Sequence, residues 1–231
     1  MRENLIFVPG LLCSSDMWLA QISAFEEHYD LYLFDHTAHD NLPDMVRAFL
    51  KDAPGSFALA GLSMGGYIAF EVMRQASDRV EKLVLLDSNA RADREPQIKM
   101  RQELIQRAGK EDIRDIAQEL TEYLIHPEQM KNAELCGRIL DMASEVGAGA
   151  FQKQQKALMG RPDSREFLPE IKCPTLIICG EQDMLTPPKV HQEMADLIPG
   201  AEMHIIADCG HLSTMERPDE VNRLMSEFFR D

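Results

Sequence analysis

Residues 57–66 read FALAGLSMGG, a run of apolar residues that leads through a serine and three glycines into a new segment. The first four residues are typical of a buried strand, and the apolar residues that follow recur at helical spacing and predict a helix over residues 64–76. Gly61, Ser63 and Gly65 thus form a G-x-S-x-G turn between strand and helix, which is typical of a nucleophile elbow. In such a turn the Ser63 hydroxyl projects above the sheet, near the positive end of the helix dipole. The alternative interpretation is an ordinary tight turn that contains a serine.

Other short apolar runs resemble this strand, and together they predict about six strands, at residues 5–8, 31–34, 57–60, 83–86, 175–179 and 203–206. Helices are predicted between the strands, at residues 43–51, 64–76, 188–197 and 218–229. This alternation is typical of an α/β fold with a mostly parallel, doubly wound sheet, whose strands are apolar because helices cover both faces. Ligands bind at the carboxyl edge of such a sheet, so functional residues are expected in the loops that follow the strands.

Residues 91–170 break the alternation because they contain no convincing strand. The apolar residues of segment 113–124 share one helical face, and those of segment 98–108 do so more loosely. Glycines at residues 147–149 and at residue 160 indicate breaks between helices. We therefore expect a sheet domain made of residues 1–90 and 171–231, with an all-helical insertion of residues 91–170 after the fourth strand.

A nucleophilic serine needs a base and an acid that orients the base, and later loops offer both. Asp183 lies in the loop after the fifth predicted strand, and His211 lies in the loop after the sixth. Because the carboxyl ends of parallel strands meet at one edge, Ser63, Asp183 and His211 are expected to come together as nucleophile, acid and base. Asp87 is a rival acid because it also follows a strand, but the G-x-x-D context favours Asp183. The other six histidines lie outside comparable contexts and are interpreted as ordinary surface residues.

From the loop at residues 9–10 through the elbow to residues 210–211 and the closing helix, the chain resembles the α/β-hydrolase fold family. The resemblance implies that the hydroxyl of Ser63 attacks an acyl carbon while His211 takes its proton. Asp183 would fix the histidine tautomer and stabilise the imidazolium. Water activated by His211 would then cleave the acyl-Ser63 intermediate.

The resemblance also implies an oxyanion hole built from two backbone N–H groups, those of Leu11 and Met64. The sequence departs from the family pattern at three points. The family's His-Gly pair reads Pro9-Gly10, which removes a side chain that commonly braces the loop. Residues 35–40, DHTAHD, stand where the family has a D-x-x-G-H-G turn. The family's first two antiparallel strands are also expected to be missing, which leaves a six-stranded parallel sheet.

Residues 91–170 lie where this family places a lid, so they are expected to cover the site and select the substrate. The alternative is a purely structural helical layer. Cys13 and Trp18 follow the oxyanion loop and are candidates for the substrate pocket, although Trp18 also fits simple helix packing. Arg91 lies where the lid begins and could contact a substrate carboxylate, although an arginine in such a segment is commonly solvated.

The leading functional hypothesis is a serine hydrolase that cleaves a small carboxylic ester, thioester or lactone. A second hypothesis keeps the triad and changes the reaction to carbon–carbon bond hydrolysis, a lyase reaction, acyl transfer or cofactor-free perhydrolysis, because function resides in the site and not in the fold. A third is a ligand-binding module without turnover. No cofactor and no metal are expected, and the Asp and His residues of segment 35–40 are interpreted as a solvated loop.

The composition argues against nucleic-acid and membrane partners. The 231 residues carry a formal charge of −15, which repels nucleic acids and anionic membrane surfaces. No apolar run reaches the roughly 20 residues that span a bilayer. The N-terminal residues do not fit a signal peptide, and the five cysteines contain no C-x-x-C pair, so a cytoplasmic protein is expected. The sequence leaves open whether the protein is a monomer or a homodimer.

Overall fold

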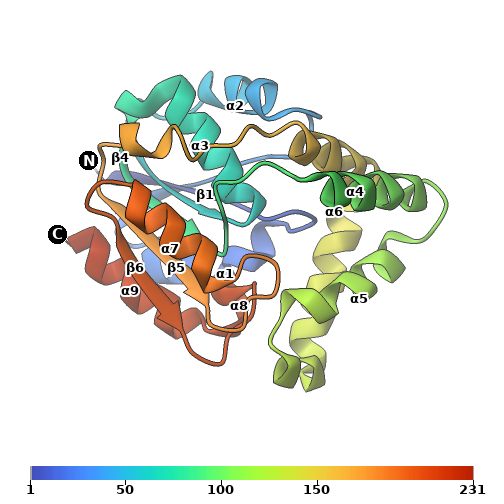
Figure 1. The fold of residues 1–231 in the computed structure, drawn as a ribbon. Coiled ribbons are helices and arrows are strands. Elements are labelled where there is room, and N and C mark those ends of the chain that lie inside the picture. Colours follow the sequence, from blue (N-terminus) through green and yellow to red (C-terminus); the bar gives the residue numbers. More distant parts are fainter. Residues whose placement is uncertain (1, 231) are drawn as a thin grey trace.

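The computed structural model describes residues 2–230 and contains one sheet of six parallel strands in the order β2-β1-β3-β4-β5-β6 (Figure 1). The strands are β1 (Glu3–Val8), β2 (Tyr29–Leu33), β3 (Phe57–Leu62), β4 (Val80–Leu86), β5 (Thr175–Gly180) and β6 (Glu202–Ile206). All six predicted strands are present, each within three residues of its predicted ends. The prediction of a parallel, doubly wound α/β sheet is therefore confirmed.

Side chains of the inner strands alternate between two apolar layers, one on each face of the sheet. In β1, Leu5 and Phe7 belong to one layer, while Ile6 and Val8 belong to the other. This is the two-residue period of a strand, and here both faces are apolar because both are covered.

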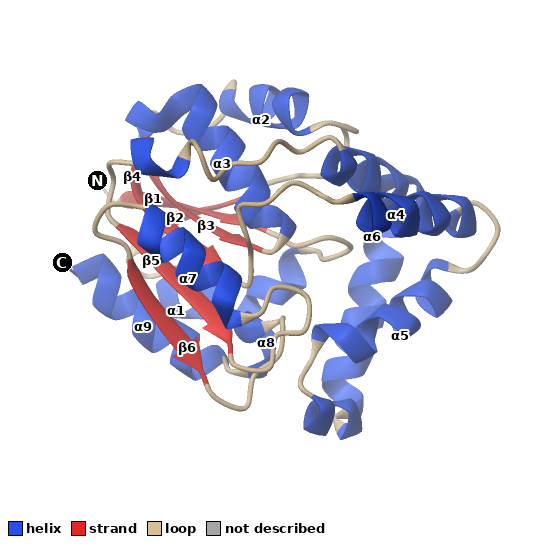
Figure 2. Cartoon of the chain, viewed as in Figure 1, coloured by secondary structure: helices blue, strands red, loops and turns tan. Residues whose placement is uncertain are grey.

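Helices α1 (Leu19–Phe25) and α9 (Pro218–Arg230) cover one face of the sheet, and α2 (Leu42–Leu50), α3 (Met64–Ala76) and α7 (Pro188–Leu197) cover the other (Figure 2). Helices α3 and α7 have the bounds that the sequence predicts. The short helix α8 (Ser213–Glu216) and the 3-10 turns η1 (Ser15–Trp18), η2 (Ser77–Arg79), η3 (Pro127–Lys131) and η4 (Leu168–Glu170) complete the order of elements. No helix within residues 2–230 has the length and apolar character needed to cross a bilayer.

Three helices lie between β4 and β5 and stand to one side of the sheet: α4 (Glu95–Ala108), α5 (Ile113–Leu124) and α6 (Ala133–Met159) (Figure 1). They share an apolar cluster of their own, into which Leu12 of the loop after β1 also packs. The break expected near residues 147–149 is a kink within α6, because only Gly147 leaves the helical conformation, with φ 75° and ψ 163°. The helix ends at Gly160, where the sequence indicates a second break.

Candidate active site

Ser63 lies between β3 and α3 in a backbone conformation that L-residues rarely adopt, with φ 54° and ψ −113°. The glycines on either side make this turn possible. A Cβ on Gly61 would lie 2.4 Å from the carbonyl oxygen of Gly65, and a Cβ on Gly65 would lie 2.1 Å from that of Val8. Any larger residue at these positions would force the strand and helix apart, so the G-x-S-x-G pattern reflects close packing of the backbone. The turn holds the side chain of Ser63 at the carboxyl end of β3.

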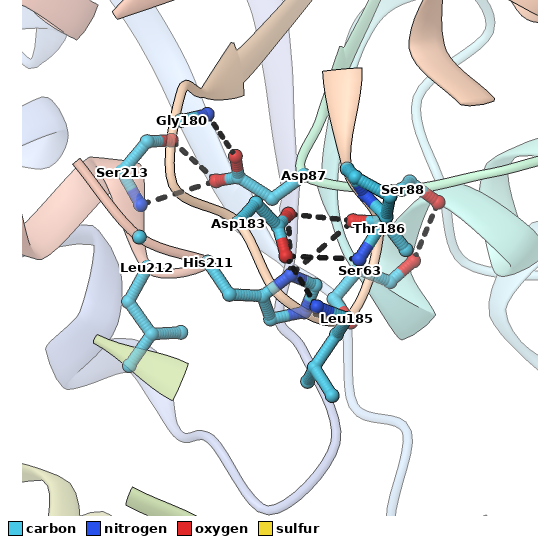
Figure 3. A network of polar contacts seen from close by, with 12 residues as sticks. Ser63, Asp87, Ser88, Gly180, Asp183, Leu185, Thr186, His211, Leu212 and Ser213 are labelled. Atoms are coloured by element: carbon cyan, nitrogen blue, oxygen red, sulfur yellow. Dashed lines mark hydrogen bonds and ion pairs between the residues drawn. The ribbon is translucent and has the colours of Figure 1, made fainter. Parts of the chain in front are cut away.

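The side chains of Ser63, His211 and Asp183 form a continuous chain of hydrogen bonds (Figure 3). His211 Nε2 lies 2.8 Å from Ser63 Oγ, and His211 Nδ1 lies 2.8 Å from Asp183 Oδ2. Asp183 also accepts hydrogen bonds from the backbone N–H groups of Leu185 and Thr186, and from the Thr186 hydroxyl at 2.6 Å. The structure thus brings together the three residues that the sequence singled out from three separate loops.

Asp87, the rival acid, lies in the same region but faces other partners (Figure 3). Its carboxyl oxygens accept hydrogen bonds from the backbone N–H groups of Gly180 and Ser213, and one of them also forms a hydrogen bond with the Ser213 hydroxyl. It therefore joins the ends of β4 and β5 to the start of α8 and makes no hydrogen bond to His211. Burial, followed by the negative charge of Asp183, raises the pKa of Asp87 to about 8, so this carboxyl is largely protonated at neutral pH.

The charges of the hydrogen-bonded chain oppose the effect of burial. Burial alone would lower the pKa of His211, but the negative charge of Asp183 and the hydrogen bond to it raise that pKa above the ordinary value. Burial alone would raise the pKa of Asp183, but the charge of His211 and the hydrogen bonds from His211 and Thr186 lower it. Asp183 is therefore ionised at neutral pH and favours a positive charge on His211.

The loop after β1 is fixed at several points beside Ser63. His36 Nε2 lies 2.8 Å from the carbonyl oxygen of Gly10, and the Leu12 N–H donates to Oε1 of Gln154, a residue of α6. Leu12 itself has φ 60°, so the loop is held in a strained turn. The N–H of Leu11 donates to no group within residues 2–230, and the N–H of Met64 belongs to the first turn of α3, where the helix provides no acceptor.

His36 and His191 do not fit the expectation of surface histidines, because both are buried. His36 braces the loop after β1 from the neighbouring segment, in place of the brace that the Pro9 departure removes. His191 accepts a hydrogen bond from the N–H of Ser88, and burial lowers its pKa to about 4, so the ring is neutral. The segment around His36 is thus only partly the solvated loop that was expected. No cluster of three or more His, Cys, Asp or Glu residues in the described part of the chain is arranged to hold a metal ion.

A cavity of about 350 Å³ opens onto Ser63 and His211 between the sheet and helices α4–α6. Its volume falls within the range of roughly 300–1,000 Å³ that is common for small-molecule sites. Most of its wall is apolar, and helices α4, α5 and α6 contribute a large part of it, including Leu104, Leu120 and Ile139.

Of the three predicted pocket residues, only Cys13 lines this cavity. Burial raises the pKa of its thiol to about 12, so the thiol stays protonated. Trp18 is fully buried and stacks on Phe7 with ring centroids 4.8 Å apart, so it packs the core. Arg91 forms an ion pair with Glu193 of α7 at 2.8 Å and does not line the cavity. Trp18 thus fits the alternative of simple packing, and neither Trp18 nor Arg91 lines the cavity.

Several polar residues that line the cavity were not predicted, namely Tyr67, Asn89, Gln97, Arg101, Gln155 and Arg161. Two of them carry a usable signal in the sequence. Tyr67 lies four residues after Ser63, one helical turn along α3, and Asn89 lies three residues after the carboxyl end of β4. The others lie on or beside α4 and α6, whose faces become defined only when these helices pack on one another.

Comparison with known proteins identifies relatives over nearly the whole chain. A family model described as alpha/beta hydrolase fold matches residues 3–218. A Bacillus subtilis protein named carboxylesterase YbfK is 28% identical over 255 residues, which cover 97% of this chain and 79% of the relative. The 3-oxoadipate enol-lactonase 1 of Acinetobacter baylyi is 25% identical over 238 residues, which cover 98% of this chain and 88% of the relative.

Among solved structures, a thermophilic esterase from Thermogutta terrifontis superposes on the chain with a TM-score of 0.89 and 28% sequence identity. The superposition covers 100% of this chain and 91% of the esterase. The likeness therefore includes helices α4–α6 as well as the sheet and its covering helices.

Proposed function

The chain belongs to the α/β-hydrolase fold family, and we propose on this premise that it is a serine hydrolase acting on a small carboxylic ester, thioester or lactone. The observation that carries the proposal is the hydrogen-bonded chain from Asp183 through His211 to Ser63, which ends in the cavity. Relatives named as a carboxylesterase and an enol-lactonase support ester or lactone cleavage. The expected partner is a small molecule that fits the cavity.

In the first half of the proposed reaction, Ser63 Oγ attacks the acyl carbon while His211 Nε2 takes its proton. Asp183 accepts the hydrogen bond from His211 Nδ1, which keeps Nε2 free to act as the base and stabilises the imidazolium. The N–H groups of Leu11 and Met64 donate to the oxyanion that develops on the substrate. His211 then gives its proton to the leaving oxygen or sulfur, and acyl-Ser63 remains.

In the second half, a water molecule attacks the acyl carbon of acyl-Ser63 while His211 Nε2 takes one of its protons. The same two N–H groups stabilise the second oxyanion. When it collapses, the carboxylic acid leaves and His211 returns the proton to Ser63 Oγ. The enzyme is regenerated with one ester bond broken and one water consumed.

We assign the role of a lid to residues 91–170, which lie between the two parts of the sheet domain, 1–90 and 171–231. The contacts of this insertion with the reacting groups support the assignment. The carbonyl oxygen of Leu124, at the end of α5, accepts a hydrogen bond from the N–H of His211 at 2.8 Å. Glu216 joins His126, two residues further along the lid, to the histidine loop, since it accepts from the N–H groups of both His126 and Gly210. A change in the contacts between the lid and the substrate is therefore expected to affect the position of His211.

The proposal is tested by labelling with a fluorophosphonate, which reacts covalently with activated serine nucleophiles. We expect one equivalent of the reagent to abolish turnover of p-nitrophenyl acetate, and peptide mapping to place the label on Ser63. Labelling elsewhere, or full inhibition without modification of Ser63, would refute the assignment. Labelling of Ser63 together with failure to turn over any ester, thioester or lactone would instead favour the other reactions that use the same triad.

The protonation of His211 predicts the pH dependence of turnover. The base works only when neutral, so kcat/KM is expected to be constant at high pH and to fall about tenfold per pH unit below the pKa of His211. Because Asp183 raises this pKa, the midpoint should lie above the ordinary histidine value of 6.5. The measurement is a profile of kcat/KM for p-nitrophenyl acetate between pH 5 and 9. A midpoint at or below 6.5 would contradict the expected effect of Asp183.

A further inference from the structure

The cavity beside Ser63 has one polar end, built from α3, the loop after β4, and helices α4 and α6. Its polar side chains are those of Tyr67, Asn89, Gln97, Arg101, Gln155 and Arg161. The rest of the wall is mostly apolar, so this end differs sharply from its surroundings. A substrate that fills the cavity must place a polar group here or leave the uncommitted donors among these side chains without partners.

Arg161 and Asp93 form a buried ion pair that is the rigid part of the polar end. The side chain of Arg161 is 4% exposed and that of Asp93 is fully buried, and their ion pair spans 2.7 Å. Arg161 also donates to the carbonyl oxygens of Arg91 and Leu158, and its guanidinium lies 4.3 Å from the centroid of the Tyr67 ring. These contacts connect the loop after β4 to the end of α6. Arg161 therefore stabilises the structure and is less available than a free arginine to bind a substrate.

Arg101 is only partly committed to protein groups. Its Nε donates to Asp93 at 2.6 Å, and its Nη1 donates to Oε1 of Gln155 at 2.8 Å. Its Nη2 donates no hydrogen bond to any group within residues 2–230, although the side chain is only 12% exposed. Arg101 therefore retains N–H donors at the wall of the cavity.

Gln155 and Tyr67 add further donors beside it. Because an arginine can only donate, Gln155 must turn Oε1 toward Arg101, and its amino group then points elsewhere. This Nε2 is buried and has no hydrogen-bond partner among the described residues. The Tyr67 hydroxyl accepts a hydrogen bond from Asn89 at 2.9 Å, and its own hydrogen has no acceptor within residues 2–230. Burial keeps this hydroxyl protonated, because it raises the pKa of Tyr67.

The charges of this end do not cancel. Arg101 and Arg161 contribute two positive charges, and the single carboxylate between them, that of Asp93, leaves one positive charge in excess. In a mostly apolar cavity such an excess favours an anion, and a carboxylate forms stronger hydrogen bonds with arginine than a neutral group does. A neutral polar group would satisfy the donors but not the charge.

We propose that the polar end of the cavity binds a carboxylate that the substrate carries away from its reacting acyl carbon, with Arg101, Gln155 and Tyr67 as donors. The preferred substrates are then half-esters of dicarboxylic acids, or lactones that bear a carboxylate. This inference rests on the proposed hydrolase function and names the substrate class for the same site. Arg101 supplies the charge, while Gln155 and Tyr67 fix the orientation of the carboxylate.

The test compares each half-ester with its neutral counterpart of the same shape. The probes are the monomethyl esters of succinate, glutarate, adipate and pimelate, and the same molecules with the free carboxylate replaced by a primary amide. We expect at least one pair in which kcat/KM favours the acid by tenfold or more. Arg101→Met should lower this ratio about 10- to 100-fold, which is what a hydrogen bond to a charged group is worth. The ion pair between Asp93 and Arg161 remains in this variant.

Lys99→Met is the matched control because it removes one positive charge from the same helix. Lys99 is 67% exposed and does not line the cavity, so the acid-to-amide ratio should stay within twofold of the parent value. An equal loss of the ratio in both variants would show a general field effect and overturn the proposed site. Gln155→Met provides a second variant within the site, should Arg101→Met fold poorly, and is expected to lower the ratio as well.

The outcomes separate this inference from the proposed function. Hydrolysis of all probes without a preference for the acids would overturn the carboxylate site and leave the hydrolase function intact. Hydrolysis of none would leave the proposed function without support, but binding can still be measured. Monomethyl adipate is then titrated calorimetrically into Ser63→Ala protein with and without Arg101→Met. Binding that depends on Arg101 would support the site, and equal or absent binding would overturn it.

Discussion

Replacing Ser63 with alanine should lower kcat/KM for p-nitrophenyl acetate by about 10⁴-fold or more, since triad nucleophiles in serine hydrolases contribute up to about 10⁶-fold. Without Oγ there is no group to form the acyl intermediate. His211 Nε2, which lies 2.8 Å from Oγ in the parent protein, then has no serine hydroxyl to deprotonate. The N–H groups of Leu11 and Met64, the proposed oxyanion donors, remain together with the cavity, so slow residual turnover by water is expected above the rate in solution. The measurement is single-substrate kinetics on purified protein, with circular dichroism to show that the fold is retained.

Ser77→Ala serves as the control for this variant. Ser77 lies at the other end of the same helix, α3, and is exposed, so its loss should change kcat/KM less than twofold. Retention of more than one per cent of the parent activity by Ser63→Ala would show that another group performs the attack. The fluorophosphonate label should also be absent from the alanine variant.

The sequence predicted the sheet and the turn at Ser63 because both depend on local patterns. An apolar run that ends at G-x-S-x-G leaves few conformations open to the backbone, since Gly61 and Gly65 mark the points where strand and helix pass within contact distance. The parallel order of strands then places the loops that carry Asp183 and His211 at one edge. Local sequence and sheet topology were therefore sufficient for this part of the site.

The sequence could not define the cavity, because its wall depends on how α4, α5 and α6 pack on one another and on the sheet. Arg101 and Gln155 lie on separate helices, 54 positions apart, and their side chains meet only in the folded chain. Trp18 shows the converse case, since its proximity to the oxyanion loop along the chain suggested a pocket residue, while its ring stacks in the core beneath. Closeness along the sequence does not determine whether a side chain faces the cavity or the core.

Asp183→Asn should lower kcat for the same ester by about 10⁴-fold, the loss that accompanies the wrong histidine tautomer in a serine hydrolase. The backbone N–H groups of Leu185 and Thr186 both donate to Oδ1 of Asp183, so the asparagine oxygen should occupy that position. Its amino group then faces His211 Nδ1 and donates to it, which leaves the proton on Nε2. A histidine in this tautomer cannot accept the proton of Ser63. The measurement is kcat with saturating ester at pH 8.

Asp87→Asn distinguishes a catalytic acid from a structural one, because Asp87 also follows a strand and is also buried. The backbone N–H groups of Gly180 and Ser213 donate to Oδ1 and Oδ2 of Asp87, so an amide amino group at either position would face an N–H and leave both unsatisfied. This should destabilise the fold by about 1–3 kcal/mol and lower the melting temperature by about 2–12 °C. The turnover of the folded protein should fall less than tenfold, since His211 keeps its partner. If Asp87→Asn instead lost about 10⁴-fold in kcat while Asp183→Asn retained activity, the acid of the triad would be Asp87, and the hydrogen bond between Asp183 and His211 would only hold the loops together.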